Sequence, residues 1–183
     1  MAAHSISVHL LFLALVASVR GQICGTAANQ PCNATQIFSS FNMSYLAEST
    51  SDTSQGNCTY LVLQSQQIDN GQANFSLLTR PEDGTQVTSD IETATLTESP
   101  DVISVVFASD PDTTYEVDLP FANYSACFVT RFSAAIGCRL WVYEGTAPEM
   151  VEACKEGHVQ ACGEPVYSTY NDTLCASGPT GSA

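Results

Sequence analysis

The stretch ACFVTRFSAAIGCRLWV, residues 126–142, decides the fold of this chain. Apolar and polar side chains alternate on both sides of a turn at residues 135–137, which is typical of two antiparallel strands joined by a hairpin. The alternation places Arg139, Trp141 and Tyr143 on one face of the second strand. A chain with only 5 Lys+Arg therefore carries a positive side chain inside an apolar strand.

Alternating runs of this kind fill the middle of the chain. Eight of them lie between about residue 37 and Tyr143: IFSSFNMSYL, CTYLVLQSQQI, ANFSLLTR, QVTSDIETATL, DVISVVFA, TYEVDL, CFVTRF and CRLWVY. Turn residues such as Asp69-Asn70-Gly71 and Asp110-Pro111-Asp112 separate the runs, with no helical pattern between them. We predict an all-β fold, an eight-stranded antiparallel barrel, because closure leaves no exposed edge; a β-sandwich is the alternative.

One helix is predicted after the last strand, packed on the outside of the barrel. The segment PEMVEACKEGHVQAC begins with a proline suited to a first helical turn and places Val151, Cys154 and His158 along one stripe. Cys154 and His158 lie four residues apart, but two ligands are too few for a zinc site. We therefore expect an ordinary exposed helix face there, and no metal or cofactor.

The N-terminus has the pattern of a secretory signal peptide. Its apolar run VHLLFLALVA is too short to span a bilayer and is followed by Val19-Arg20-Gly21, which a signal peptidase could cut before Gln22. Residues 1–21 are predicted to be the signal peptide and residues 22–183 a single domain, secreted to the extracellular space.

Cysteines and glycosylation sequons agree with that destination. The eight cysteines predict four disulfides and no free thiol. Six N-x-S/T sequons are predicted glycosylation sites: Asn33, Asn42, Asn57, Asn74, Asn123 and Asn171. The formal net charge of -14 leaves no basic patch for nucleic acid or an acidic membrane surface.

The sequons also orient two strands, because a glycan cannot point into a barrel. If Asn42 and Asn74 face outward, alternation turns their neighbours inward: Phe41, Met43, Tyr45, Phe75 and Leu77. The interior is therefore predicted to be aromatic and apolar, either as a packed core or as a ligand pocket.

The residues of the opening stretch carry a family resemblance. Cys127-Phe128-Val129, then Gly137-Cys138-Arg139-Leu140-Trp141-Val142, then Cys154 resemble the salivary lipocalins of ticks, the histamine-binding-protein-like family. Those proteins commonly carry Cys-Asp-Val, Glu-Leu-Trp and a cysteine in the helix. The resemblance implies a lipocalin-like barrel; it covers most of the mature chain in layout and is specific from Cys127 to Cys175.

The resemblance also implies part of a disulfide map. Carried over by position, Cys58 pairs with Cys175, and Cys127 pairs with Cys154. The remaining cysteines are Cys24, Cys32, Cys138 and Cys162. They could form Cys24–Cys32 and Cys138–Cys162 or cross between these sets, and the sequence leaves both arrangements open.

The family function implied is capture of a small molecule: histamine, serotonin, a leukotriene or a fatty acid inside the barrel. In the amine binders two inward carboxylates hold the ammonium group, and here those positions are Phe128 and Arg139. Histamine and serotonin are therefore not expected to bind through that motif. An enzyme is not expected either, because His158 is the only imidazole after the signal peptide and the cysteines near it are expected to be bridged.

The residues favour a different ligand, an amphipathic acid such as a fatty acid or leukotriene. Arg139 would bind the carboxylate, and apolar walls would hold the tail. The predicted ligand-binding residues are Arg139, Trp141, Tyr143, Phe128, Phe41, Met43, Tyr45, Phe75 and Leu77. The chain is expected to be a monomer. Three alternatives to this role of Arg139 and this ligand stay open. Arg139 could pair with an internal acid or face solvent, the outer surface could bind a host immune or complement protein, or an amine could bind at a non-standard site.

Overall fold

The computed structural model describes residues 23–25, 30–52, 57–67, 70–81, 87–132, 136–175 and 178. The predicted signal peptide lies outside these ranges. Among the described residues, no helix combines the length and apolar character that a membrane crossing requires.

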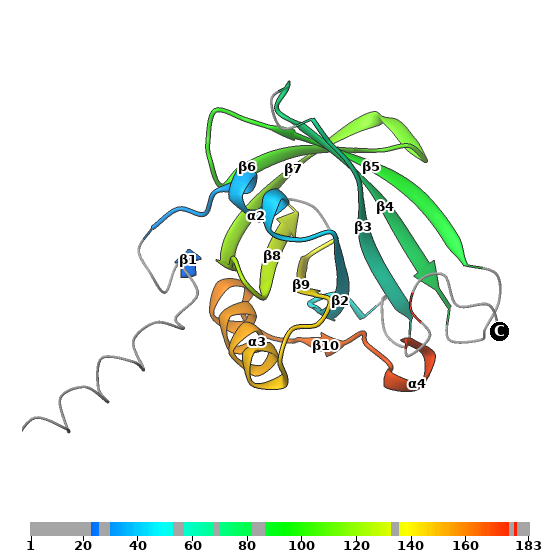
Figure 1. Cartoon of the computed structure of the whole chain (residues 1–183), viewed down its shortest axis with the longest axis vertical. Coiled ribbons are helices and arrows are strands. Elements are labelled where there is room, and N and C mark those ends of the chain that lie inside the picture. Colours follow the sequence, from blue (N-terminus) through cyan, green and yellow to red (C-terminus); the bar gives the residue numbers. More distant parts are fainter. Residues whose placement is uncertain are drawn as a thin grey trace, which may run out of the picture.

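Eight antiparallel strands form a closed barrel (Figure 1). They are β2 (Met43–Ser49), β3 (Cys58–Gln67), β4 (Gln72–Arg80), β5 (Thr88–Leu96), β6 (Val102–Phe107), β7 (Asp110–Asn123), β8 (Cys127–Phe132) and β9 (Cys138–Tyr143). Each strand pairs with the next along the chain, and β9 pairs back to β2 with Leu46 opposite Trp141. The predicted barrel is thus confirmed, and the sandwich alternative is excluded.

The hairpin of β8 and β9 has the predicted alternation of side chains between its two faces. Phe128 lies opposite Trp141, and Thr130 lies opposite Arg139. Phe128 and Trp141 belong to the interior cluster, whereas Val129, Leu140 and Val142 belong to a second cluster on the outer face. The alternation therefore separates the interior set from the outer set as expected.

In the described chain, two short strands and three helices lie outside the eight barrel strands. Strand β1 (Ile23–Gly25) pairs with β7, and β10 (Tyr167–Ser168) pairs with β2. The helices are α2 (Ala34–Ser40), α3 (Pro148–Cys162) and α4 (Asp172–Cys175). Helix α3 is the predicted C-terminal helix on the outside of the barrel and has the predicted bounds, whereas the short helices α2 and α4 were not predicted.

Helix α2 replaces the start of the first predicted strand. The Asn33 side chain accepts a hydrogen bond from the Gln36 backbone N–H at 3.0 Å, which caps the helix N-terminus. Ile37 and Phe38 are buried against the barrel interior, so the helix closes part of one end. The strand begins only at Met43, after a bend at Asn42.

This bend overturns the predicted orientation of Met43 and Tyr45. Both pack on the outer wall with Tyr60 and Tyr170, whereas Leu46 lies in the interior cluster. Alternation counted from Asn42 fails because residues 41 and 42 precede the strand and do not follow its pleat. Phe41 itself is buried in the interior, as predicted.

Stacked rings fill one part of the interior. The ring of Phe41 lies 5.9 Å from Phe75, 5.2 Å from Phe128 and 5.1 Å from Tyr143, centroid to centroid. Burial of each large apolar side chain contributes about 1.5–3 kcal/mol, so this cluster is a substantial stabilising core. This region is packed core rather than open pocket.

Helix α3 lies against the outer face of β7, β8 and β9 (Figure 1). Its buried residues are Cys154, Gly157 and His158. A Cβ added at Gly157 would collide with the ring of Phe121, so glycine permits the close approach of helix and wall. The prediction of an exposed face at Cys154 and His158 was wrong, because this stripe of the helix contacts the barrel.

Four disulfides bridge all eight cysteines. Cys58–Cys175 and Cys127–Cys154 are the pairs that the resemblance implies. Of the arrangements left open, the structure has Cys24–Cys32 and Cys138–Cys162. Two of the four therefore attach α3 to the β8–β9 hairpin, each typically contributing about 2–4 kcal/mol by restricting the unfolded chain.

Candidate ligand-binding site

The candidate site is the part of the barrel interior around Arg139. The guanidinium carbon of Arg139 lies 5.4 Å from the centroid of the Phe132 ring, within the range of a cation–π contact. Its Nε atom is buried and has no hydrogen-bond partner. Arg139 is thus held in the interior by an aromatic ring, with part of its hydrogen-bonding capacity unused.

A carboxyl group shares this space. Glu92 of β5 is only 9 % exposed and lines the same cavity as Arg139. Within the described chain no direct ion pair joins them, since the three ion pairs are Arg131–Asp118, Lys155–Glu152 and His158–Glu48. The predicted alternative, in which Arg139 pairs with an internal acid, is therefore not seen in the described chain: Glu92 lines the same cavity but forms no ion pair with Arg139.

The two groups influence each other's protonation. Burial raises the pKa of Glu92 to about 7, the positive charge of Arg139 opposes the rise, and Asp90 adds to it. Burial likewise lowers the pKa of Arg139, and Glu92 opposes that change. The interior therefore holds a cation beside a carboxyl group that titrates near neutral pH.

The space between them is small. The cavity has a volume of about 10 Å³ and is lined by Phe75, Glu92, Phe128, Phe132, Arg139 and Trp141, among others. A volume of this size holds about one water molecule. The indole N–H of Trp141 is already bonded to the Thr130 hydroxyl at 3.1 Å. A ligand in the interior would therefore have to displace side chains.

Phe132, which contacts Arg139, and its aromatic neighbours Phe107 and Tyr115 are the candidates for such movement. The Phe132 ring lies 6.4 Å from Phe107 and 6.2 Å from Tyr115, and Phe107 lies 5.5 Å from Tyr115. Phe107 and Tyr115 are only partly buried. Phe107, Tyr115 and Phe132, here called the aromatic group, therefore lie in the less tightly packed part of the interior cluster.

The predicted ligand-binding residues divide into three sets. Arg139, Trp141, Phe128 and Phe75 line the cavity. Phe41, Tyr143 and the partly buried Leu77 belong to the interior cluster without lining the cavity. Met43 and Tyr45 lie on the outer wall. Their role in ligand binding stays a prediction.

Sequence reasoning missed Glu92, Phe107 and Tyr115. The run containing Glu92 was predicted as a strand, but none of its acids was assigned to the interior. The sequence signal that could have placed Glu92 inside was the apolar residue Ala94, because residues two apart share one face of a strand. In the structure Ala94 is 1 % exposed.

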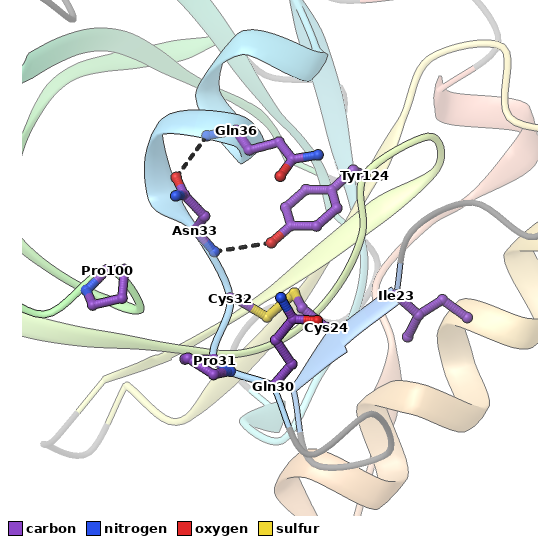
Figure 2. Close-up of a pocket in the computed structure, with 9 residues that line it drawn as sticks. All are labelled: Ile23, Cys24, Gln30, Pro31, Cys32, Asn33, Gln36, Pro100 and Tyr124. Carbon is purple, nitrogen blue, oxygen red and sulfur yellow. Dashed lines mark hydrogen bonds between the residues drawn. A yellow bond between two sulfur atoms is a disulfide. The ribbon is translucent and has the colours of Figure 1, made fainter.

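A wider cavity of about 370 Å³ lies outside the barrel (Figure 2). The Cys24–Cys32 disulfide, Asn33, Gln36 and Tyr124 line it, and the Asn33 backbone N–H donates to the Tyr124 hydroxyl at 2.9 Å. All nine lining residues carry uncharged side chains. This cavity therefore offers no charged group to recognise a charged mediator.

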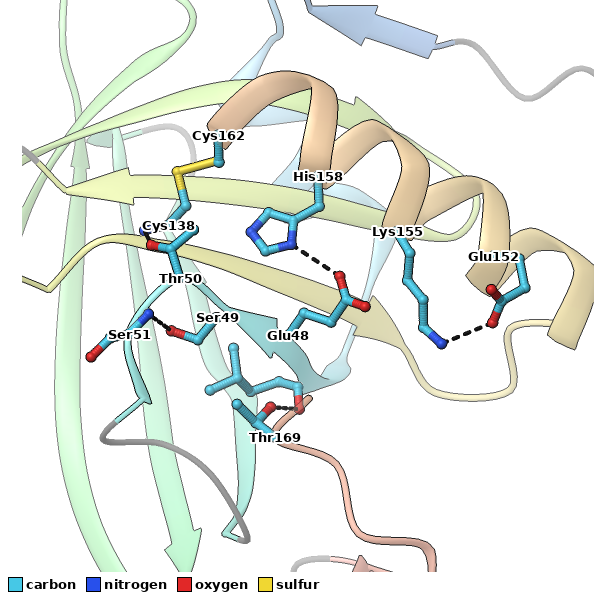
Figure 3. Close-up of polar contacts among 11 residues, drawn as sticks. Glu48, Ser49, Thr50, Ser51, Cys138, Glu152, Lys155, His158, Cys162 and Thr169 are labelled. Atoms are coloured by element: carbon cyan, nitrogen blue, oxygen red, sulfur yellow. Dashed lines mark hydrogen bonds and ion pairs between the residues drawn. A yellow bond between two sulfur atoms is a disulfide. The ribbon is translucent and has the colours of Figure 1, made fainter. Parts of the chain in front are cut away.

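A second buried polar pair lies between α3 and the barrel (Figure 3). His158 is 0 % exposed, and its Nδ1 lies 3.1 Å from Oε2 of Glu48 on β2. Its other ring nitrogen is buried without a partner. The pair is therefore a polar contact between helix α3 and the barrel wall. In the described part of the chain, no group of three or more His, Cys, Asp or Glu could hold a metal.

A closed eight-stranded antiparallel barrel with a helix on its outer wall and an aromatic, apolar interior is the architecture of the lipocalin-like class. Residues 26–177 match the family of the tick histamine binding protein, and the chain belongs to that family.

Among solved structures, the chain resembles that of AM182 in complex with serotonin. The TM-score is 0.58 and the identity 21%, over 78% of this chain and 93% of that chain. At this identity the likeness concerns the fold. A comparison with curated proteins gives no match.

Proposed function

We propose that the protein captures a small amphipathic acid, such as a fatty acid or leukotriene, in the barrel, with Arg139 binding the carboxylate. The observation that carries this proposal is the interior guanidinium with a buried, unpartnered Nε and no direct ion pair in the described chain. A buried guanidinium without a directly paired counter-ion is costly, and a bound carboxylate would supply that pairing with matched donors and acceptors.

The difference between the two ionisable groups favours an acid over an amine. Arginine does not deprotonate in proteins, whereas Glu92, with a pKa of about 7, can take up a proton. An incoming carboxylate therefore meets a permanent cation and a carboxyl group able to become neutral. An incoming ammonium group would be attracted only by the ionised form of Glu92, and Arg139 would still repel it.

The walls suit the remainder of such a ligand, provided that they open. The interior is lined by aromatic and aliphatic side chains, but its free volume of about 10 Å³ is far below that of a lipid tail. We infer that Phe107, Tyr115 and Phe132 rearrange when a ligand enters. The affinity would then include the cost of that rearrangement.

The setting proposed for this activity is extracellular. Four disulfides support an oxidising compartment. With residues 1–21 as a cleaved signal peptide and residues 22–183 as a monomeric domain, the product would sequester a host mediator and modulate inflammation or immunity.

A biogenic amine is the second candidate ligand, favoured by the interior carboxyl of Glu92 and by the family to which the chain belongs. Its site would be non-standard, because the two carboxylates of the amine-binding motif are replaced by Phe128 and Arg139. The structure offers no comparably specific observation for the remaining alternative, binding of a host protein through the outer surface.

Displacement of a fluorescent fatty acid tests the proposal. Arg139→Leu should weaken binding by about 10- to 100-fold, since a charged hydrogen-bonding partner is lost. The matched control is Arg131→Leu, because Arg131 is on the outer face, 46% exposed and paired with Asp118 at 3.0 Å. Equal binding by both variants and the unmodified protein, or no binding of acids at all, would remove the proposal. Histamine binding that depends on Glu92 would favour the second candidate.

A further inference from the structure

A second pocket lies on the outer wall of the barrel, away from Arg139. It has a volume of about 210 Å³, and its walls include Tyr45 of β2, Tyr60 of β3, Glu144 after β9 and Tyr170 near α4. Strand β2 separates it from the interior, because Tyr45 packs with the outer cluster while Leu46 packs with the inner one. We call it the outer-wall pocket.

Three tyrosine rings from distant parts of the sequence meet there. The rings of Tyr45 and Tyr170 are 4.4 Å apart, centroid to centroid. The Tyr60 hydroxyl donates to the backbone carbonyl of Cys175 at 2.8 Å, and the Cys58–Cys175 disulfide attaches this C-terminal segment to β3. The aromatic wall is therefore held in place by a hydrogen bond and a covalent bond.

A carboxylate lies at the edge of this wall. The Glu144 backbone N–H donates to the Met43 carbonyl at 3.1 Å, which places Glu144 beside the pocket. Glu144 is exposed and is the smallest of four influences on the raised pKa of Tyr60: burial and Tyr170 raise it, Arg80 lowers it, and Glu144 raises it. The nearby cation Arg80 donates to the carbonyls of Leu174 and Gly178, both at 3.3 Å.

We propose that the outer-wall pocket binds an organic ammonium ion, independently of the barrel interior. The faces of tyrosine rings attract a cation, and a carboxylate at the rim adds a charge contact. The net charge of -14 further favours cations over anions near the surface. The pocket would accept an aromatic amine with its ring among the tyrosines and its ammonium group toward Glu144.

Calorimetric titration with serotonin, and with N-acetylserotonin as the uncharged analogue, tests this site. Glu144→Gln should weaken serotonin binding about fivefold or more, and Tyr170→Leu should weaken it further because a ring face is lost. The matched control is Glu152→Gln, which removes an exposed acid on α3 that is 69% accessible and remote from the pocket. Serotonin binding to the control variant should be unchanged.

The interior variants separate this proposal from the proposed function. Serotonin binding should persist in Glu92→Gln and Arg139→Leu, and fatty-acid displacement should persist in Glu144→Gln. Serotonin binding that is lost in Glu92→Gln but kept in Glu144→Gln would place the amine in the barrel and overturn the proposal. Equal affinity for N-acetylserotonin, or no serotonin binding at millimolar concentration, would also overturn it.

Discussion

Glu92 and Arg139 line the same interior cavity and shift each other's pKa, although no direct ion pair joins them in the described part of the chain. The positive charge of Arg139 does not fully offset the effect of burial on the pKa of Glu92, which remains raised to about 7. The folded barrel thus prefers this acid in its neutral form.

Glu92→Gln should stabilise the protein at pH 8 but not at pH 4.5. The folded pKa of Glu92, about 7, lies above its ordinary value of 4.5, so the stability contributed by the protonated form is present at low pH. That contribution is lost as the pH rises from about 4.5 through 7, and glutamine, which imitates the neutral acid, avoids the loss. Thermal unfolding at both pH values measures this. The exposed Glu98→Gln is the control, and an equal change in Tm at both pH values would contradict the prediction.

Binding of a fatty acid at pH 7.5 should be accompanied by proton uptake. A second carboxylate beside Arg139 would offset the cation that favours ionised Glu92, so the pKa of Glu92 would rise further. Titration calorimetry in two buffers with different ionisation enthalpies measures the protons taken up. Glu92→Gln should abolish the buffer dependence while keeping fatty-acid binding, and a dependence that survives this change would assign the proton to another group.

Phe132→Ala should open the interior. Removing the ring takes away the contact with Arg139 and creates a cavity, with a cost in unfolding free energy of about 3 kcal/mol. Binding of an apolar fluorescent probe should increase. Val129→Ala, which also removes buried apolar atoms but on the outer face, is the control. If both variants lose stability and neither binds more probe, the aromatic group does not limit entry.

Gly157→Ala should destabilise the fold by about 1–3 kcal/mol, because the new methyl group meets the Phe121 ring where α3 contacts the barrel. In an exposed helix the same change would stabilise by up to about 1 kcal/mol, so the two mechanisms predict opposite signs. Chemical denaturation followed by tryptophan fluorescence measures the difference. Gln160→Ala on the exposed face of α3 is the control, and a more stable Gly157→Ala protein would show that the helix moves freely away from the wall.

Glycan occupancy should differ among the six sequons. Asn33 and Asn42 are exposed, whereas Asn123 is only 7% exposed and its side-chain oxygen accepts bonds from the Ser125 N–H at 3.2 Å and hydroxyl at 2.8 Å. We expect sugar at the first two positions and none at Asn123 in the folded protein. Glycopeptide mass spectrometry of protein from insect cells decides this, and full occupancy at Asn123 would contradict the buried geometry.

The barrel was predictable because its signal is repeated. Strand after strand alternates, and the run around Arg139 gives one apolar face at every second residue, so local pattern and closure agree. The α2 segment was not predictable on the same basis, because IFSSFNMSYL alternates almost as a strand does. Its helix depends on a cap at Asn33 and on burial of Ile37 and Phe38, a tertiary contact that periodicity does not reveal.

The interior site was only half predictable for a similar reason. Strand parity grouped Arg139 with Trp141 and Tyr143, which lie in the interior, but Glu92 was not assigned to the interior because a carboxylate rarely faces a core. His158 was missed in the same way, since its partner Glu48 lies 110 residues away along the chain. Buried polar pairs between distant strands and helices leave no local trace in the sequence.

The Cys58–Cys175 disulfide joins residues that are 117 positions apart, so most of the barrel lies within one covalent loop. A protease that cuts the chain once anywhere between these two cysteines leaves both fragments attached to each other. Such a nicked protein would keep the mass of the intact chain plus one water until it is reduced. The bond therefore protects the protein against separation of its fragments after a cut, and does not protect the chain against the cut itself.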